Sequence, residues 1–78
     1  MDKHLIGNNA GILWRQLNSD ASRKWEYNEI KQATGFSDRE LCAAIGWLAR
    51  EDKIQFELER NDTKSEHAYI YLMPNVYI

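Results

Sequence analysis

Apolar residues at helical spacing open the chain. Intervals of four, three and four residues predict an amphipathic helix over residues 5–18, with a core face formed by Ile6, Ala10, Leu13 and Leu17. Trp14 lies beside this face. Gly7 and Gly11 lower the helix propensity of the segment. We therefore expect another backbone to pack closely against these glycines, or the first turn to fray at Gly7.

A glycine turn separates two further helical patterns. The first covers residues 28–33 and stops at Gly35, which can adopt the left-handed conformation that ends a helix. The second begins at Ser37, because Ser37 and Glu40 have the spacing of a capping box, in which each side chain accepts the other residue's backbone amide. This helix ends near Glu51. Its apolar stripe is formed by Leu41, Ala44, Ile45 and Leu48.

Strict alternation of apolar and polar residues follows the helices. Residues 53–59 predict a strand with one polar, solvent-exposed face and one apolar face, which is formed by Ile54, Phe56 and Leu58. Residues 61–67 are predicted to be a polar loop. Alternation resumes over residues 68–73, so the two runs together predict a hairpin.

One extended segment precedes the second helix. Residues 23–27 are long enough only for a stub of strand or an extended entry, which Trp25 and Tyr27 anchor. The order of elements predicts a mainly α fold with a small antiparallel β-hairpin, a winged helix-turn-helix of three helices plus a wing, in a single domain over residues 1–78. The predicted core residues are Leu13, Leu17, Ile30, Leu41, Ile45, Leu48, Ile54, Phe56 and Ile70.

Two stretches carry a family resemblance. The strings "IGNNAGILW" at residues 6–14 and "AAIGWLAREDKI" at residues 43–54 resemble the small bacterial winged helix-turn-helix proteins of uncharacterised function. The second string is the more specific, because a Trp-Leu-Ala-Arg-Glu helix end directly before a Lys-Ile strand is unusual. The resemblance implies a winged helix fold and transcription-related roles. It implies no particular ligand or DNA site.

Length and composition limit the functions that the domain can carry. A chain of 78 residues holds one small core, of a size at which folding alone is marginal and a partner helps. Its net charge of -2 lacks the basic excess expected of a protein that grips phosphates. One cysteine cannot form an internal disulfide, and no apolar run has the length of a membrane span or a signal peptide. These features predict a soluble cytoplasmic protein without membrane contact.

The distribution of charge bears on DNA binding. Residues 28–50 contain three positive and three negative side chains, and residues 53–67 contain three positive and four negative ones. Because non-specific affinity for DNA depends on neutralised phosphates, we expect only weak binding to DNA. The candidate contacts are Ser37 and Arg39 at the start of the third helix and Lys64 in the hairpin loop. The alternative for Arg39 is a solvated ion pair with the adjacent aspartate or another nearby carboxylate.

Small side chains and a tryptophan mark a second candidate surface. The third helix carries a low apolar patch that a second helix can approach closely, formed by Cys42, Ala43, Gly46 and Trp47. The alternative is that Trp47 folds back onto its own domain and the small residues fit beneath it. The C-terminal residues Val76, Tyr77 and Ile78 add apolar groups that so small a core leaves uncovered. We therefore predict a symmetric homodimer that uses these residues, since most soluble oligomers are closed homo-oligomers.

Candidate catalytic and metal-binding residues are few. His4 lies near one end and His67 in the predicted loop, and Cys42 has no histidine or asparagine near it in sequence to activate the thiol. Glu57 and Glu59 share a strand face but lack histidine or cysteine partners for a metal. We therefore predict no enzymatic activity, cofactor, metal site or small-molecule substrate.

The function predicted from the sequence is that of a non-enzymatic, transcription-associated and DNA-binding-like regulator that acts as a homodimer. The alternative is a protein-interaction or dimerisation module without sequence-specific DNA binding. The two hypotheses are compatible, because a dimer can present Arg39 and the wing to two half-sites.

Overall fold

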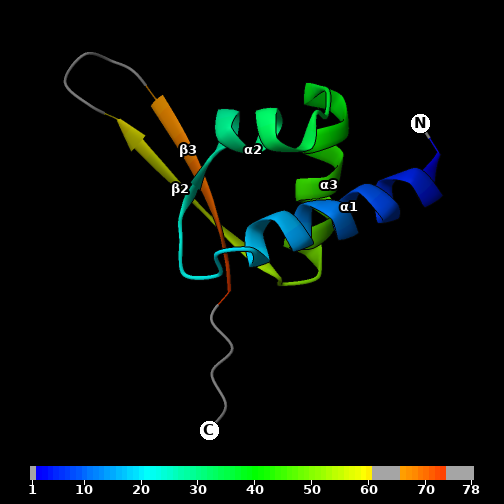
Figure 1. Cartoon of the computed structure of the whole chain (residues 1–78), viewed down its shortest axis with the longest axis horizontal. Helices are drawn as coiled ribbons and strands as arrows, with labels where there is room; N and C mark the ends of the chain where they lie inside the picture. The colour runs from blue at the N-terminus through cyan, green and yellow to red at the C-terminus, as the bar shows by residue number, and fades with distance from the viewer. Residues whose placement is uncertain (1, 61–65, 74–78) are drawn as a thin grey trace, which may run out of the picture.

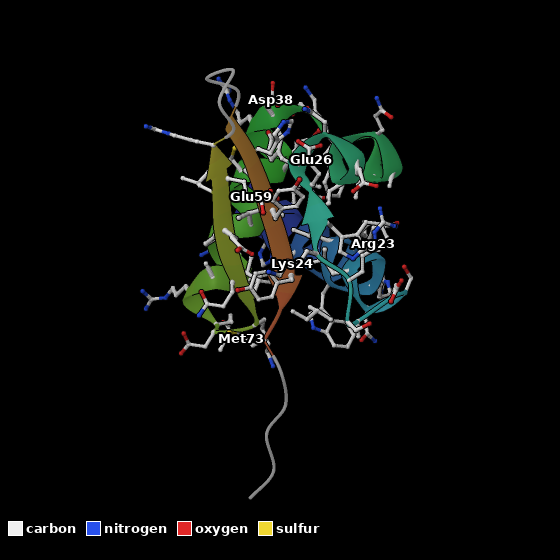
Figure 2. The ribbon with its side chains drawn as sticks, turned by 90° about the vertical axis from the view of Figure 1, so that its left-hand side faces the viewer. Arg23, Lys24, Glu26, Asp38, Glu59 and Met73 are labelled. Atoms are coloured by element: carbon white, nitrogen blue, oxygen red, sulfur yellow. The ribbon has the colours of Figure 1, made fainter. Side chains whose placement is uncertain are left out.

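Three helices cover one face of a small sheet in the computed structural model, which describes residues 2–60 and 66–73 (Figure 1). Seen from the side, the sheet lies in front and the helices lie behind it (Figure 2). The elements in chain order are α1 (Lys3–Asn18), β1 (Trp25–Glu26), α2 (Tyr27–Thr34), α3 (Asp38–Arg50), β2 (Ile54–Arg60) and β3 (Glu66–Leu72). The core therefore lies between the helices and the inner face of the sheet, and the predicted winged helix architecture is confirmed.

α1 begins at an aspartate cap. The Asp2 carboxylate accepts the His4 backbone amide at 3.0 Å, so the helix starts at Lys3 and its first turn is closed. Among the described residues, no other backbone segment packs closely against Gly7 or Gly11, contrary to what had been expected. A Cβ on Gly7 would instead lie 3.8 Å from the indole of Trp47, and nothing lies within 4 Å of a Cβ on Gly11. The prediction that these glycines admit another backbone was wrong.

The turn between α2 and α3 has the predicted form. Gly35 follows the last residue of α2 with a φ of 72°, in the left-handed region where a residue without a Cβ is favoured. Ser37 and Glu40 form the predicted capping box at the start of α3. A second capping box was not predicted: Glu26 and Glu29 cap α2 in the same reciprocal way.

The sheet has three strands, where the sequence predicted a two-stranded wing. Its order is β1–β3–β2, and both neighbouring pairs are antiparallel. The predicted stub of strand joins it, because Trp25 lies opposite Ile70 and Glu26 lies opposite Tyr69. The segment between α1 and α2 is thus held against the last strand of the domain.

β3 begins earlier than the alternation indicated. The loop predicted over residues 61–67 is too long at its C-terminal end, since β3 starts at Glu66 and His67 lies opposite Glu59. Both paired residues at this position are polar, so they gave no apolar alternation from which a strand could be recognised.

Most of the predicted core is confirmed. The buried apolar residues are Ala10, Leu13, Leu17, Trp25, Ile30, Leu41, Ala44, Leu48, Ile54 and Ile70. Ile45 is half-buried and packs against this cluster. Trp25, expected only to anchor an extended segment, is a full core residue because its partner across the sheet is Ile70, which is 1% exposed.

Phe56 was wrongly assigned to the core. It is 50% exposed, and Leu58 on the same face is 69% exposed. Phe56 lies opposite buried Ile70, but β2 is the edge strand, so no neighbouring strand covers its other side. The C-terminal end of β2 also extends past the helices (Figure 1). Only Ile54, at the start of the strand, is buried on this face.

Substitution of Leu48 tests the core assignment. Leu48→Ala is expected to lower the free energy of unfolding by about 2–5 kcal/mol, because it truncates a buried leucine and leaves a cavity. Leu5→Ala, at a leucine that is 42% exposed, is the matched control and should cost less than about 1 kcal/mol. Chemical denaturation followed by circular dichroism measures both. Equal losses would show that the core stripe of α3 is misassigned.

Candidate functional site

Ser37, the first candidate for a DNA contact, caps helix α3. Its hydroxyl oxygen accepts the Glu40 backbone amide at 3.1 Å, and the Glu40 carboxylate accepts the Ser37 backbone amide at 2.9 Å. The bond from the Ser37 backbone, helped by its side chain, holds the pKa of Glu40 below its ordinary value. These contacts stabilise the start of α3 and leave Ser37 little freedom to contact a base.

Asp38 joins α2 to α3. The Tyr27 hydroxyl donates to the Asp38 carboxylate at 2.7 Å, and the Lys31 ammonium lies 3.0 Å from the same oxygen. The bond from Tyr27 and then that from Lys31 lower the pKa of Asp38. Partial burial, followed by the bond to Asp38, raises the pKa of Tyr27. The adjacent aspartate is thus held by α2 and is not the partner of Arg39.

Two arginines stand on the outward face of α3. Residues 39, 43, 46 and 50 follow one another at intervals of four, three and four, so they form one stripe along the side of the helix opposite the core. Arg39 and Arg50 are exposed, and neither forms an ion pair within residues 2–60 and 66–73. Ala43 and Gly46 lie between them. The middle of the stripe therefore has no side-chain hydrogen-bonding group.

The predicted small-residue patch is divided between two sides of α3. The Cys42 sulfur lies 3.8 Å from the Tyr27 hydroxyl, towards the start of α2. The Trp47 indole instead lies over Gly7 of α1. Trp47 keeps 44% of its surface exposed, so it neither points fully outward nor is buried within its own chain. Gly46, between the two sides, is open, because nothing lies within 4 Å of a Cβ built there.

An aromatic hollow lies between α1 and α3 and was not predicted. It has a volume of about 440 Å³, and its lining includes Trp14, Trp47, Gly7 and Gly11. The sequence carries a signal for it, since residues 7, 11 and 14 recur at helical spacing on the flank of α1 beside the core face. The two glycines form an open floor between the two indoles.

The outer face of the sheet is polar and internally paired. Lys24 forms an ion pair with Glu57 on β2 and lies 5.2 Å from the ring centre of Tyr71 on β3. Figure 2 shows Lys24 and Glu59 on this face, in front of the helices. The remaining candidate residues, Lys64, Val76, Tyr77 and Ile78, lie outside the described residues.

The described part of the chain has neither a grouped set of metal ligands nor a helix suited to span a membrane. No three histidine, cysteine, aspartate or glutamate side chains there are grouped so that they can hold a metal ion. No helix there combines the length and the apolar character needed to cross a membrane.

The contact between Tyr27 and Asp38 makes a prediction about acid stability. Tyr27→Phe is expected to raise the pKa of Asp38 towards its ordinary value, because the Tyr27 hydroxyl is the largest cause of its lowering. A carboxyl with a lower pKa in the folded state stabilises the fold above its unfolded pKa, and this contribution is lost as the pH falls through the folded pKa. Below about pH 4 the wild type should therefore lose more stability than the variant.

Carboxyl NMR titration and denaturation at several pH values measure these two effects. The titration of Glu40 is the internal control, because its hydrogen bonds come from Ser37 and not from Tyr27. An unchanged pKa of Asp38 in Tyr27→Phe would contradict the assigned contact.

Comparison with known proteins agrees with this architecture. Residues 1–72 match the family described as "Winged helix-turn-helix domain (DUF2582)". The solution NMR structure of protein BT2368 from Bacteroides thetaiotaomicron is similar, with a TM-score of 0.65 and 33% identity, over 92% of this chain and 79% of that chain. The uncharacterised protein MJ1608 of Methanocaldococcus jannaschii is 37% identical over 49 residues, which are 63% of this chain and 70% of that protein. The resemblance inferred from the two sequence strings is confirmed, and this chain belongs to the DUF2582 family of winged helix-turn-helix domains.

Proposed function

We propose that this domain is a non-enzymatic, transcription-associated regulator that acts as a homodimer. It works through contacts between proteins, and its helix α3 packs against protein in preference to reading bases. The observation that carries the proposal is the outward stripe of α3. Helix-turn-helix proteins read base edges with polar and charged side chains in the first turns of this helix. Here the middle of the stripe is Ala43 and Gly46, with the half-exposed indole of Trp47 beside it.

The wing supports the same proposal. In the described part of β2 the exposed side chains include the apolar Phe56 and Leu58 on one face and Glu59 on the other, and the one cation of the strand is Arg60 at its end. Carboxylates repel phosphates, and exposed apolar side chains gain nothing from them. Large exposed apolar groups instead mark surfaces that contact other proteins.

DNA contact is a second candidate because of Arg39 and Arg50. Both are exposed on one stripe, and their eleven-residue separation corresponds to about 16 Å along the helix. The carboxylates at the start of α3 are not direct partners of Arg39, since Asp38 binds Tyr27 and Lys31 and Glu40 binds Ser37. Two guanidinium groups can contact phosphates without specifying sequence. They supply only a small part of the charge on which affinity for DNA depends.

DNA affinity distinguishes the two candidates. We expect random-sequence duplex DNA to bind no tighter than about 10 μM at physiological salt, because few phosphates would be neutralised. Fluorescence anisotropy with labelled duplex measures it. Submicromolar binding that weakens steeply with salt would favour the DNA candidate. In that event, Arg39→Ala with Arg50→Ala should abolish the binding if α3 is the site, and Lys64→Ala would report on the wing.

Self-association tests the proposed homodimer. Sedimentation velocity over a concentration series is expected to show a monomer–dimer equilibrium, because the apolar groups left exposed on one small domain are covered in a symmetric pair. The measurement is made at low and high salt without DNA. A chain that stays monomeric at its highest attainable concentration would refute the homodimer.

A further inference from the structure

One side of β2 carries free backbone groups. The order β1–β3–β2 leaves that side without a strand, at the left of the sheet in Figure 2. The Met73 amide donates to the Lys53 carbonyl oxygen at 2.9 Å, so this pair is hydrogen-bonded at the start of the β2–β3 ladder. Bonded and non-bonded pairs alternate along an antiparallel ladder. The residues whose amide and carbonyl groups point away from β3 are therefore Ile54, Phe56 and Leu58.

The same edge has an exposed apolar face. Phe56 is 50% and Leu58 is 69% exposed, and both lie on the side of the sheet that carries the helices, because their partners across the ladder are Ile70 and Ala68. Proteins usually protect a long edge strand with inward charges, proline or a bulge. On this face of the described strand the one charged residue, Arg60, lies at the end, and the middle of the strand has the large apolar side chains of Phe56 and Leu58 instead. The edge is suited to accept another strand.

We propose that the strand added to this edge is β2 of a second copy of the chain, paired antiparallel about a twofold axis at Phe56. This inference rests on the proposed homodimer and identifies its interface. In this register Phe56 faces Phe56 of the second copy, and Ile54 faces Leu58 of the second copy. The outward backbone groups of these residues then bond to one another, so each chain's free edge is satisfied by an identical one.

Charge complementarity selects the register. On the polar face, Lys53 lies opposite Glu59 of the second copy, and Gln55 lies opposite Glu57 of the second copy. The twofold axis repeats each pair, which gives two ammonium–carboxylate pairs and two amide–carboxylate pairs. Both Lys53 and Glu59 are exposed in the single chain. Opposite charges directly across an antiparallel pair are stabilising, whereas like charges are destabilising.

A shift of the axis by one residue towards the C-terminus removes this match. Pairing about Glu57 would place Glu57 directly opposite its own copy and Gln55 opposite Glu59 of the second copy. Lys53 would then have no carboxylate across the interface within the strand. A shift the other way, to Gln55, would place Lys53 opposite Glu57, which already pairs with Lys24, and Leu58 opposite Asp52, outside the strand. The register about Phe56 is therefore the one of these three in which backbone bonds, apolar contacts and charges agree.

The pairing also accounts for the exposed apolar side chains. Residues directly opposite each other lie on the same face of a sheet, so the helices of both copies stand on one side of a continuous six-stranded sheet. Phe56 and Leu58 then lie in the floor between the two sets of helices, where the second copy covers them. The outward stripe of α3 takes no part in these strand contacts, so in the dimer it stays available to pack against a further protein partner.

Charge reversal across the interface tests the register. Lys53→Glu and Glu59→Lys each turn two opposite-charge pairs into two like-charge pairs, and each should raise the dimer dissociation constant by about tenfold or more. The double variant restores opposite charges with their order exchanged and should return the constant to within a few-fold of wild type. Sedimentation velocity measures all four proteins. Lys3→Glu, the same charge change at the exposed start of α1, should leave the constant unchanged.

Two further variants separate this interface from one on α3. Leu58→Lys places a charge on the apolar side of the edge and should abolish the dimer, while chemical shifts of buried residues such as Leu13 confirm that the domain is folded. Trp47→Ala should leave the dimer intact. Loss of the dimer in Trp47→Ala, with no effect of Leu58→Lys, would overturn the edge pairing while the homodimer stands. Single charge reversals that the double variant fails to rescue would overturn the register, and a monomeric wild type would overturn both proposals.

Discussion

The architecture depends on one antiparallel pair, Trp25 of β1 opposite Ile70 of β3. This pair holds the segment between α1 and α2 against the last strand. The N-terminal half of the chain is thereby joined to the C-terminal strand of the sheet. Both side chains are buried in the core. The indole nitrogen of Trp25 is buried and makes no hydrogen bond within the described residues, which is a cost that the apolar area of the ring offsets. The Arg23 guanidinium lies over the Trp25 ring, 4.1 Å from its centre, and also pairs with Glu29 in the cap of α2.

Charged groups in this domain are used largely for local structure. Asp2, Glu26 and Glu40 accept backbone amides at the starts of the three helices, and Asp38 binds α2 to α3. Acidic side chains placed there also suit the positive end of each helix dipole. The carboxylates of the helix-turn-helix therefore bond to groups of the same domain. The outer side of α3 has two arginines at the ends of its stripe and two small residues between them.

Features that depend on neighbours in sequence were predictable. The helices, the left-handed Gly35 and the Ser37–Glu40 box follow from local spacing, and the structure confirms them. The family resemblance could also be read from two short strings. Capping by Glu26 and Glu29 was missed because glutamate is an uncommon cap, although the spacing is the same as that of a serine box.

Features that depend on strand order could not be predicted. Alternation shows that Phe56 shares a face with Ile54, but not that β2 is an edge strand on which that face is uncovered. The burial of Trp25 likewise follows from a pairing between distant segments. At the candidate site, the charge balance of α3 was correct as a count, yet the count could not show which carboxylates were already held by Tyr27, Lys31 and Ser37.

The caps around α2 and α3 have a consequence for the conformational entropy of folding. Both capping boxes join residues three apart, and the Tyr27–Asp38 bond joins residues eleven apart. The pair of Trp25 and Ile70 joins residues forty-five positions apart. Contacts between residues close in sequence form with little loss of conformational entropy. To complete the sheet, the chain must close one long loop, which costs more. The closure that brings β3 back to β1 therefore costs the chain more conformational entropy than formation of the contacts between α2 and α3.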